Sequence, residues 1–199
     1  MARRTTRVPD LSQRCPRCLF RPEVCLCPEI PRLEPRTRFV IVRHAAERRR
    51  TSNSGRWAAL ALGCPLLDYG ALDVGFDDAP LREPGTALLF PDAPAGTSLA
   101  TVPARVVVLD ASWAQARRMV QRIDALRGLP RIALPAPAAP ENAGLPRLLR
   151  PPHADGMSTI EAMARVLELA GETAEAAALD AVYAEAQRRS WLLRGVTAP

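Results

Sequence analysis

The most informative stretch of the chain runs from Val106 to Met119 and reads VVVLDASWAQARRM. Its apolar run predicts a buried strand over Arg105–Leu109, and a helix is expected over Ser112–Leu126. Asp110 lies between the two, and ligands of parallel α/β sheets bind where strands end. Taken alone, the stretch favours a simple helix cap beside a core tryptophan.

Similar strand and helix signals alternate along the rest of the chain. Strands are expected at Phe39–Val42, Pro65–Tyr69, Thr86–Phe90 and Arg131–Leu134, and helices at Arg56–Gly63, Ser158–Leu169 and Thr173–Leu193. This order predicts an α/β fold with a mostly parallel sheet. Residues 70–85 should form a loop, and the long Pro-rich loop 135–156 is expected to be functional.

Four of the five cysteines lie together, as Cys15-x2-Cys18-x6-Cys25-x-Cys27. Four thiolates suit a structural zinc ion, which would stabilise a segment with few apolar residues. An iron–sulfur site, a redox dithiol and chance are the alternatives. Cys64 is expected to be a small buried residue. The predicted organisation is a disordered basic tail (1–14), a zinc-binding segment (15–36) and a catalytic domain (37–199).

The charge of the chain favours a polyanionic partner. The 199 residues carry a net charge of +6, and all 27 basic side chains are arginine. Guanidinium groups bind phosphate bidentately, so RNA is a natural partner, although a merely soluble basic protein has the same composition. No apolar run reaches the ~20 residues that span a bilayer, and the N-terminus lacks a secretory pattern. A cytoplasmic protein without a membrane partner is expected.

Several motifs together resemble the DTW-domain family. Asp110-Ala111-Ser112-Trp113 is similar to the family's Asp-x-Thr-Trp, with serine for threonine. The four-cysteine cluster, the block from His44 to Arg56, Leu89-Phe90-Pro91 and Ser158-Thr159-Ile160-Glu161-Ala162 follow the family pattern in order. Two departures are Ala45, where proline is usual, and a missing tyrosine in the segment 144–150.

The resemblance implies a tRNA-uridine aminocarboxypropyltransferase. Such enzymes transfer the 3-amino-3-carboxypropyl group of S-adenosylmethionine to N3 of a uridine and release methylthioadenosine. The family is related to SPOUT methyltransferases, so a SPOUT-like sheet with a C-terminal trefoil knot is expected. A SPOUT-like RNA methyltransferase and a non-catalytic zinc-containing RNA-binding module remain alternatives. An rRNA substrate is less expected than tRNA, and monomer or homodimer stays open.

The candidate site residues follow from that chemistry. Asp110 is the candidate base for the uridine N3 proton, or else orients a ligand or caps the helix. Ser112 and Trp113 would contact cofactor or base, or instead cap the helix and fill the core. The cofactor candidates are Leu89, Phe90, Pro91, Leu109, Ser158, Thr159 and Glu161. The RNA candidates are Arg48, Arg50, Asn53, Arg56, Arg117 and Arg118.

Overall fold

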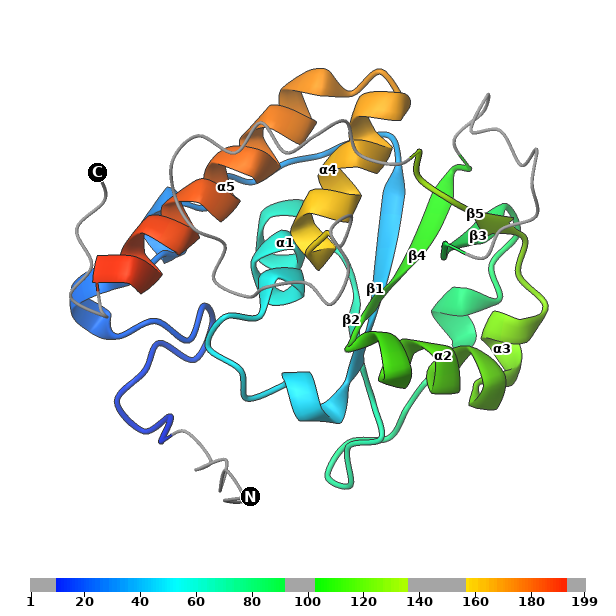
Figure 1. Ribbon diagram of the computed structural model, residues 1–199, viewed down its shortest axis with the longest axis horizontal. Helices are drawn as coiled ribbons and strands as arrows, with labels where there is room; N and C mark the ends of the chain where they lie inside the picture. The colour runs from blue at the N-terminus through cyan, green and yellow to red at the C-terminus, as the bar shows by residue number, and fades with distance from the viewer. Residues whose placement is uncertain (1–9, 92–102, 136–156, 193–199) are drawn as a thin grey trace, which may run out of the picture.

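A five-stranded parallel sheet forms the centre of the protein (Figure 1). The computed structural model describes residues 10–91, 103–135 and 157–192. The strands are β1 (Arg38–His44), β2 (Leu66–Tyr69), β3 (Thr86–Leu89), β4 (Arg105–Asp110) and β5 (Arg131–Ile132). Their order is β2-β1-β4-β3-β5, and each neighbouring pair is parallel. The expected α/β fold with a parallel sheet is confirmed.

Helices cover both faces of the sheet. One face packs against α1 (Ser54–Leu62), α4 (Thr159–Leu169) and α5 (Thr173–Leu192), and the other against α2 (Trp113–Arg122) and α3 (Asp124–Arg127) (Figure 1). Alternate side chains of the central strands enter the two layers, as pleated strands require. Val106 and Val108 face the first layer, and Val107 faces the second. Strands buried on both faces read as continuous apolar runs, which is why the valine run predicts β4 so clearly.

Local signals place the ends of the helices that carry the site. Asn53 caps α1, because its Oδ1 accepts the backbone N–H of Arg56 at 2.9 Å. Gly63 ends α1 at φ +60°, a conformation that glycine adopts without strain. Ser158 and Glu161 form the expected capping box at the start of α4, with Ser158 N–H donating to Glu161 Oε2 at 2.7 Å. These caps satisfy backbone N–H groups that a helix leaves unpaired.

One predicted helix is two helices in the structure. The expected helix Ser112–Leu126 stops at Arg122, because Ile123 is extended at φ −92° and ψ 107°. The chain then turns into the short helix α3. This break lets Ile123, Ala125 and Leu126 all enter the same apolar layer as Met119. A straight helix would have turned part of that set towards water.

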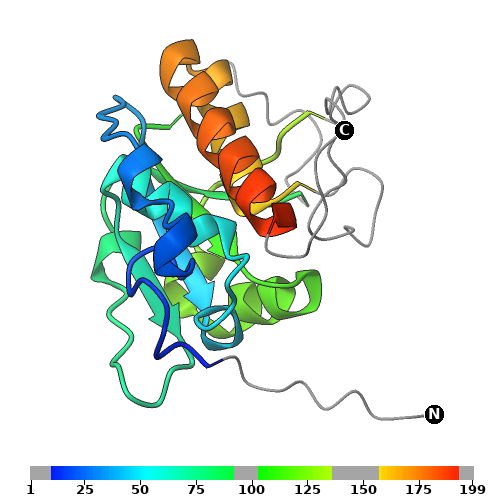
Figure 2. The same cartoon turned by 90° about the vertical axis from the view of Figure 1, so that its left-hand side faces the viewer.

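The cysteine-rich segment packs on the helical layer formed by α1 and α5. It contains two short 3-10 helices, η1 (Pro22–Val24) and η2 (Cys27–Glu29). Figure 2 shows this segment beside α5. Phe20 and Leu26 are buried in the core cluster of that layer. Residues 10–14, expected to belong to the basic tail, form a turn in which Arg14 donates to the Leu19 carbonyl at 3.0 Å.

Two further short helices occupy loops. η3 (Ala45–Glu47) follows β1 directly, and η4 (Ala79–Leu81) lies within the expected loop 70–85. Residues 136–156 lie outside the described residues, and so does most of the long loop expected to be functional. The trefoil knot and the SPOUT relationship therefore stay predictions. Within the described ranges, no helix is both long and apolar enough to cross a membrane.

Candidate functional site

Asp110 is the centre of the candidate site. It is the last residue of β4 and is only 5% exposed. Its Oδ2 accepts a hydrogen bond from Asn53 Nδ2 at 2.6 Å, and its Oδ1 accepts one from Thr159 Oγ1 at 2.9 Å. The carboxylate thus joins the end of β4 to the starts of α1 and α4. Burial raises the pKa of Asp110, and the bonds from Asn53 and Thr159 oppose that rise.

Gly55 allows the start of α1 to lie against this carboxylate. A Cβ atom at position 55 would lie 2.7 Å from Asp110 Cγ and 2.8 Å from its Oδ2. Such distances are well inside van der Waals contact, so any larger residue would displace either the helix or the carboxyl group. The glycine of the Gly55-Arg56 pair is therefore required by close approach to Asp110.

A second carboxyl group lies near the first. Glu47, at the end of η3, is 7% exposed, and its Oε1 has no hydrogen-bond partner in the described structure. Its Oε2 lies 3.2 Å from Arg50 Nε. Burial raises the pKa of Glu47; Arg50 opposes the rise, and the charge of Asp110 adds to it. Two buried carboxyl groups that influence each other are typical of sites that handle protons.

Arg43, which is buried, and Asp68, which is partly buried, form an ion pair beside these carboxyl groups. They lie at the ends of β1 and β2, opposite each other in the parallel register. Arg43 Nε and Nη2 donate to the two Asp68 oxygens at 2.7 and 3.0 Å. Arg43 Nη1 is buried without a partner among the described residues. The bidentate bonds fix the guanidinium group next to Asp110, and its positive charge opposes the raised pKa there.

His44, the last residue of β1, and the start of α2 lie at the same end of the sheet as Asp110. His44 Nδ1 accepts the backbone N–H of Ala46 at 3.1 Å and lies 3.3 Å from Gln115 Nε2. Burial, and then the nearby charge of Arg118, lower the pKa of His44, which favours a neutral ring.

Ser112 is exposed and donates its hydroxyl to Gln115 Oε1 at 2.7 Å. Ser112 is the N-cap of α2, and its backbone N–H donates to Gln115 Oε1 at 2.9 Å in a capping box; Trp113 is half-buried at the first position of that helix.

Four of the five expected RNA-binding arginines fall into two groups. Arg48 pairs with Asp73 at 2.6 Å and with Asp68 at 3.5 Å, and Arg50 pairs with Glu47. Arg117 and Arg118, in contrast, are exposed on α2 and form no ion pair within the described ranges. This second group is therefore the better placed of the two to offer its guanidinium groups to a phosphate.

The expected cofactor residues come from three segments that meet at the Asp110 edge. Leu89 ends β3, which pairs with β4, and Phe90 and Pro91 follow it directly; Leu109 precedes Asp110. Thr159 touches Asp110 directly, while Ser158 and Glu161 bind each other in the α4 cap. Phe90 is nearly buried, and the Arg131 guanidinium lies 5.9 Å from its ring centre. These segments bring apolar side chains of β3 and β4 and the polar cap of α4 to the same end of the sheet.

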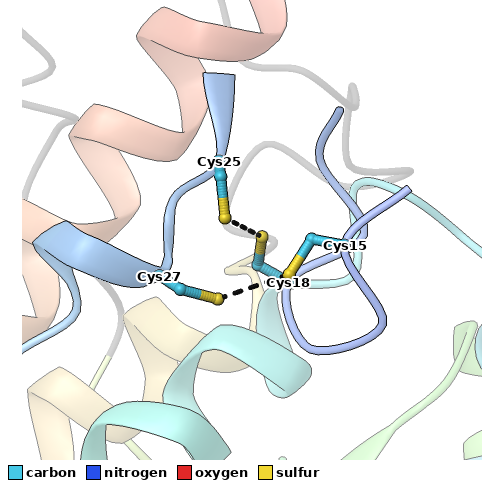
Figure 3. A group of neighbouring side chains, drawn as sticks. All are labelled: Cys15, Cys18, Cys25 and Cys27. Atoms are coloured by element: carbon cyan, nitrogen blue, oxygen red, sulfur yellow. Dashed lines mark hydrogen bonds between the residues drawn. The ribbon is translucent and has the colours of Figure 1, made fainter. Parts of the chain in front are cut away.

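The four clustered cysteines converge on one point (Figure 3). All four Sγ atoms lie within 4.8 Å of one another, and Cys15–Cys27 and Cys18–Cys25 are 3.6 and 3.7 Å apart. A tetrahedral Zn–S bond of about 2.3 Å places sulfur atoms about 3.8 Å apart, whereas a disulfide needs about 2.05 Å. The arrangement fits one tetrahedral metal ion.

The thiol chemistry of the cluster suits the same interpretation. Burial raises the pKa of Cys15, but backbone N–H groups of Cys18 and Arg17 outweigh it and bring the pKa to about 7. Burial raises the pKa of Cys25 and Cys27, so these thiols need a cation to lose their protons. Cys64 is not part of the cluster, and burial raises its pKa to about 12.

Sequence reasoning missed the roles of several site residues, namely Arg43, Glu47, Gly55, Asp68 and Gln115. The block from His44 to Arg56 signalled Glu47 and Gly55 as part of the family pattern, but gave them no role. Arg43 and Asp68 carried a weaker signal, a charged residue near the end of a buried strand, which only the strand order brings together.

The family model of the DTW domain matches residues 12–190 of this chain. That match covers the cysteine cluster, the whole sheet and nearly all of α5. No solved structure matches the chain.

Proposed function

The chain belongs to the DTW-domain family, and from that premise we propose that it is a tRNA-uridine aminocarboxypropyltransferase that uses S-adenosylmethionine. DTW domains are associated with tRNA-modifying enzymes, which supports a role in tRNA modification. The proposed reaction is transfer of the 3-amino-3-carboxypropyl group to uridine N3. The observation that supports this proposal is the buried Asp110 carboxylate, which accepts two hydrogen bonds at the carboxyl end of the sheet.

The proposed chemistry needs a proton acceptor. Uridine N3 carries a proton and becomes nucleophilic when that proton leaves. Each carboxylate oxygen can accept two hydrogen bonds, and each Asp110 oxygen accepts one within the described structure. Asp110 therefore keeps capacity for the N3 proton, and a raised pKa makes its carboxylate a stronger base. Asn53 and Thr159 hold the carboxylate in place.

The proposed cofactor site lies at the ends of β3 and β4 and the start of α4. S-adenosylmethionine would supply a carbon activated by its positively charged sulfur. Residues Leu89 to Pro91, with Leu109, present backbone and apolar surface there, and Thr159 connects this side to Asp110. The Asp110 carboxylate also adds negative charge beside a cationic cofactor. Methylthioadenosine would leave from the same edge.

The proposed RNA contacts are the exposed arginines of α2 near this edge. Arg117 and Arg118 are exposed, and the charge of Arg118 reaches His44 at the end of β1. N3 lies on the Watson–Crick edge, so the target uridine must be unpaired or flipped out at a cost of a few kcal/mol. Trp113, at the same helix start, is the proposed stacking partner for a base.

A double-label experiment tests the proposal. Wild-type protein and the Asp110→Asn variant are incubated with unmodified tRNA and S-adenosylmethionine labelled at either the carboxyl carbon or the methyl group. Carboxyl label should enter the RNA with wild-type protein, and the rate should fall by about 10²-fold or more in Asp110→Asn, as expected for loss of a general base. Transfer of the methyl label would indicate a methyltransferase. Absence of cofactor binding would leave a non-catalytic RNA-binding module.

A further inference from the structure

The half-buried guanidinium group of Arg56 forms hydrogen bonds to two backbone carbonyl groups of the protein. Its Nη1 donates to the Arg17 carbonyl at 3.3 Å, and its Nη2 donates to the Arg48 carbonyl at 2.7 Å. Its Nε is buried and has no partner in the described structure. Burial, and then the nearby charge of Arg43, lower the pKa of Arg56. Both terminal nitrogens of this guanidinium group therefore already donate to backbone carbonyl groups of the protein.

The Arg17 carbonyl belongs to the cysteine loop. Arg17 lies between Cys15 and Cys18, which supply two of the four converging thiols. The next residue of α1, Trp57, binds the same loop, because its indole N–H donates to the Cys18 carbonyl at 3.1 Å. Trp57 is fully buried and stacks on Phe20 with ring centres 5.6 Å apart. Two consecutive residues of α1 thus hold the backbone between the first two cysteines.

The same helix start holds Asp110. The backbone N–H of Arg56 donates to Asn53 Oδ1 at 2.9 Å, and Asn53 Nδ2 donates to Asp110 Oδ2 at 2.6 Å. Gly55, one residue before Arg56, lies directly against the carboxylate. A continuous series of hydrogen bonds therefore runs from the cysteine loop through Arg56 and Asn53 to Asp110.

We infer that Arg56 is a positioning residue that links the four-cysteine loop to Asp110, and is not a phosphate contact. With a metal ion bound, the loop backbone at Arg17 becomes a fixed acceptor for Arg56. Arg56 then fixes the loop at Arg48 and the start of α1, and so the orientation of Asn53. Loss of this link should loosen both ends, the cysteine loop and the Asp110 carboxylate.

The inference has two parts, and only the effect on Asp110 rests on the proposed tRNA modification. The other half, the hold on the cysteine loop, is measured without substrate. Zinc-loaded full-length protein is mixed with a chelator, and the rate of zinc release is followed by absorbance. Arg56→Ala should release zinc at least about 5-fold faster than wild type, and hydrogen exchange should increase at residues 15–18 and 53–57.

The Arg56→Lys variant distinguishes a role of the positive charge from a role of the guanidinium geometry. Lysine keeps the positive charge but lacks the planar fork that reaches two carbonyl groups at once. A positioning role predicts that Arg56→Lys releases zinc as fast as Arg56→Ala. It also predicts that both variants keep the wild-type salt dependence of RNA binding. Arg118→Ala is the matched control: it should keep zinc as wild type does but lower the salt slope by about 1.

The opposite pattern would overturn the inference. It consists of wild-type zinc release in both Arg56 variants, together with a reduced salt slope in Arg56→Ala that Arg56→Lys restores. Should Arg56→Ala fail to fold, Arg56→Lys and Arg118→Ala still decide the outcome. A wild-type protein that transfers nothing to RNA would refute the proposed function but leave the zinc-release result interpretable.

Discussion

At the scale of single residues, the contacts of Asp110 identify the side chains that surround its carboxylate, which the motif Asp110–Trp113 does not. The motif gave Asp110, Ser112 and Trp113 as one group, yet the structure joins Asp110 to Asn53 and Thr159 from other elements. Ser112 instead binds Gln115 within its own helix start. The side chains that set the state of the carboxylate are therefore distant in sequence, and no local pattern could rank them.

Gly55 gives the sharpest steric prediction. Gly55→Ala places a Cβ 2.7 Å from Asp110 Cγ, so it should lower the free energy of unfolding by about 1–3 kcal/mol and reduce transfer activity. Gly128→Ala is the matched control, since Gly128 has a negative φ and a Cβ atom at that position would have nothing within 4 Å. Urea unfolding and transfer rates check both variants. Equal effects of the two substitutions would contradict the proposed contact.

The raised pKa of Glu47 leads us to expect that the stability of the protein falls as the pH rises. Burial raises its pKa in the folded state above the ordinary value of 4.5, so the folded protein binds this proton more tightly than the unfolded chain does. The contribution of Glu47 to stability is then full below pH 4.5 and is lost as pH rises through the raised pKa. Glu47→Gln removes this dependence.

The measurement is the urea midpoint of wild type and Glu47→Gln between about pH 4 and pH 8. The stability of wild type relative to the variant should fall as the pH rises. A difference that stays constant, or that increases with pH, would show that Glu47 titrates normally or with a lowered pKa.

At the scale of elements, apolar patterning predicted most strands and helices to within a few residues. The valine run gave β4, and the Ser158–Glu161 pair gave the start of α4. The break at Ile123 was missed because helical periodicity continues through it, and only packing against the sheet requires the turn. The arginines show the same limit: the pairing of Arg48 with Asp73 depends on a loop whose path the sequence does not reveal.

The cysteine segment gives a prediction at this scale. Purified protein should contain about one zinc ion per chain, because four Sγ atoms surround a single point. Cys18→Ser should reduce the zinc content and make the 15–36 segment more accessible to protease, since a bound metal ion would join both halves of the cysteine loop. Cys64→Ser should keep the zinc, because Cys64 lies outside the cluster. Elemental analysis by mass spectrometry decides, and full zinc in Cys18→Ser would contradict the assignment.

At the scale of the whole molecule, the strand order creates the site. Placing β1 between β2 and β4 brings Arg43, Asp68 and Asp110 to one edge, and α1 and α4 complete it from the same face. A parallel sheet was predictable from alternating strands and helices, but its order was not, because side-chain periodicity does not record which strands pair. Family membership supports a role in tRNA modification for this end of the sheet.

The most direct test of that reaction is the mass of the nucleosides from unmodified tRNA after incubation with the protein and S-adenosylmethionine. We expect a uridine heavier by about 101 mass units, the formula difference between an aminocarboxypropyl group and hydrogen, together with methylthioadenosine. A gain of about 14 mass units would contradict aminocarboxypropyl transfer, because the methyl carbon would then be the one that reacts. Unchanged uridine, in the presence of bound cofactor, would contradict tRNA as the substrate.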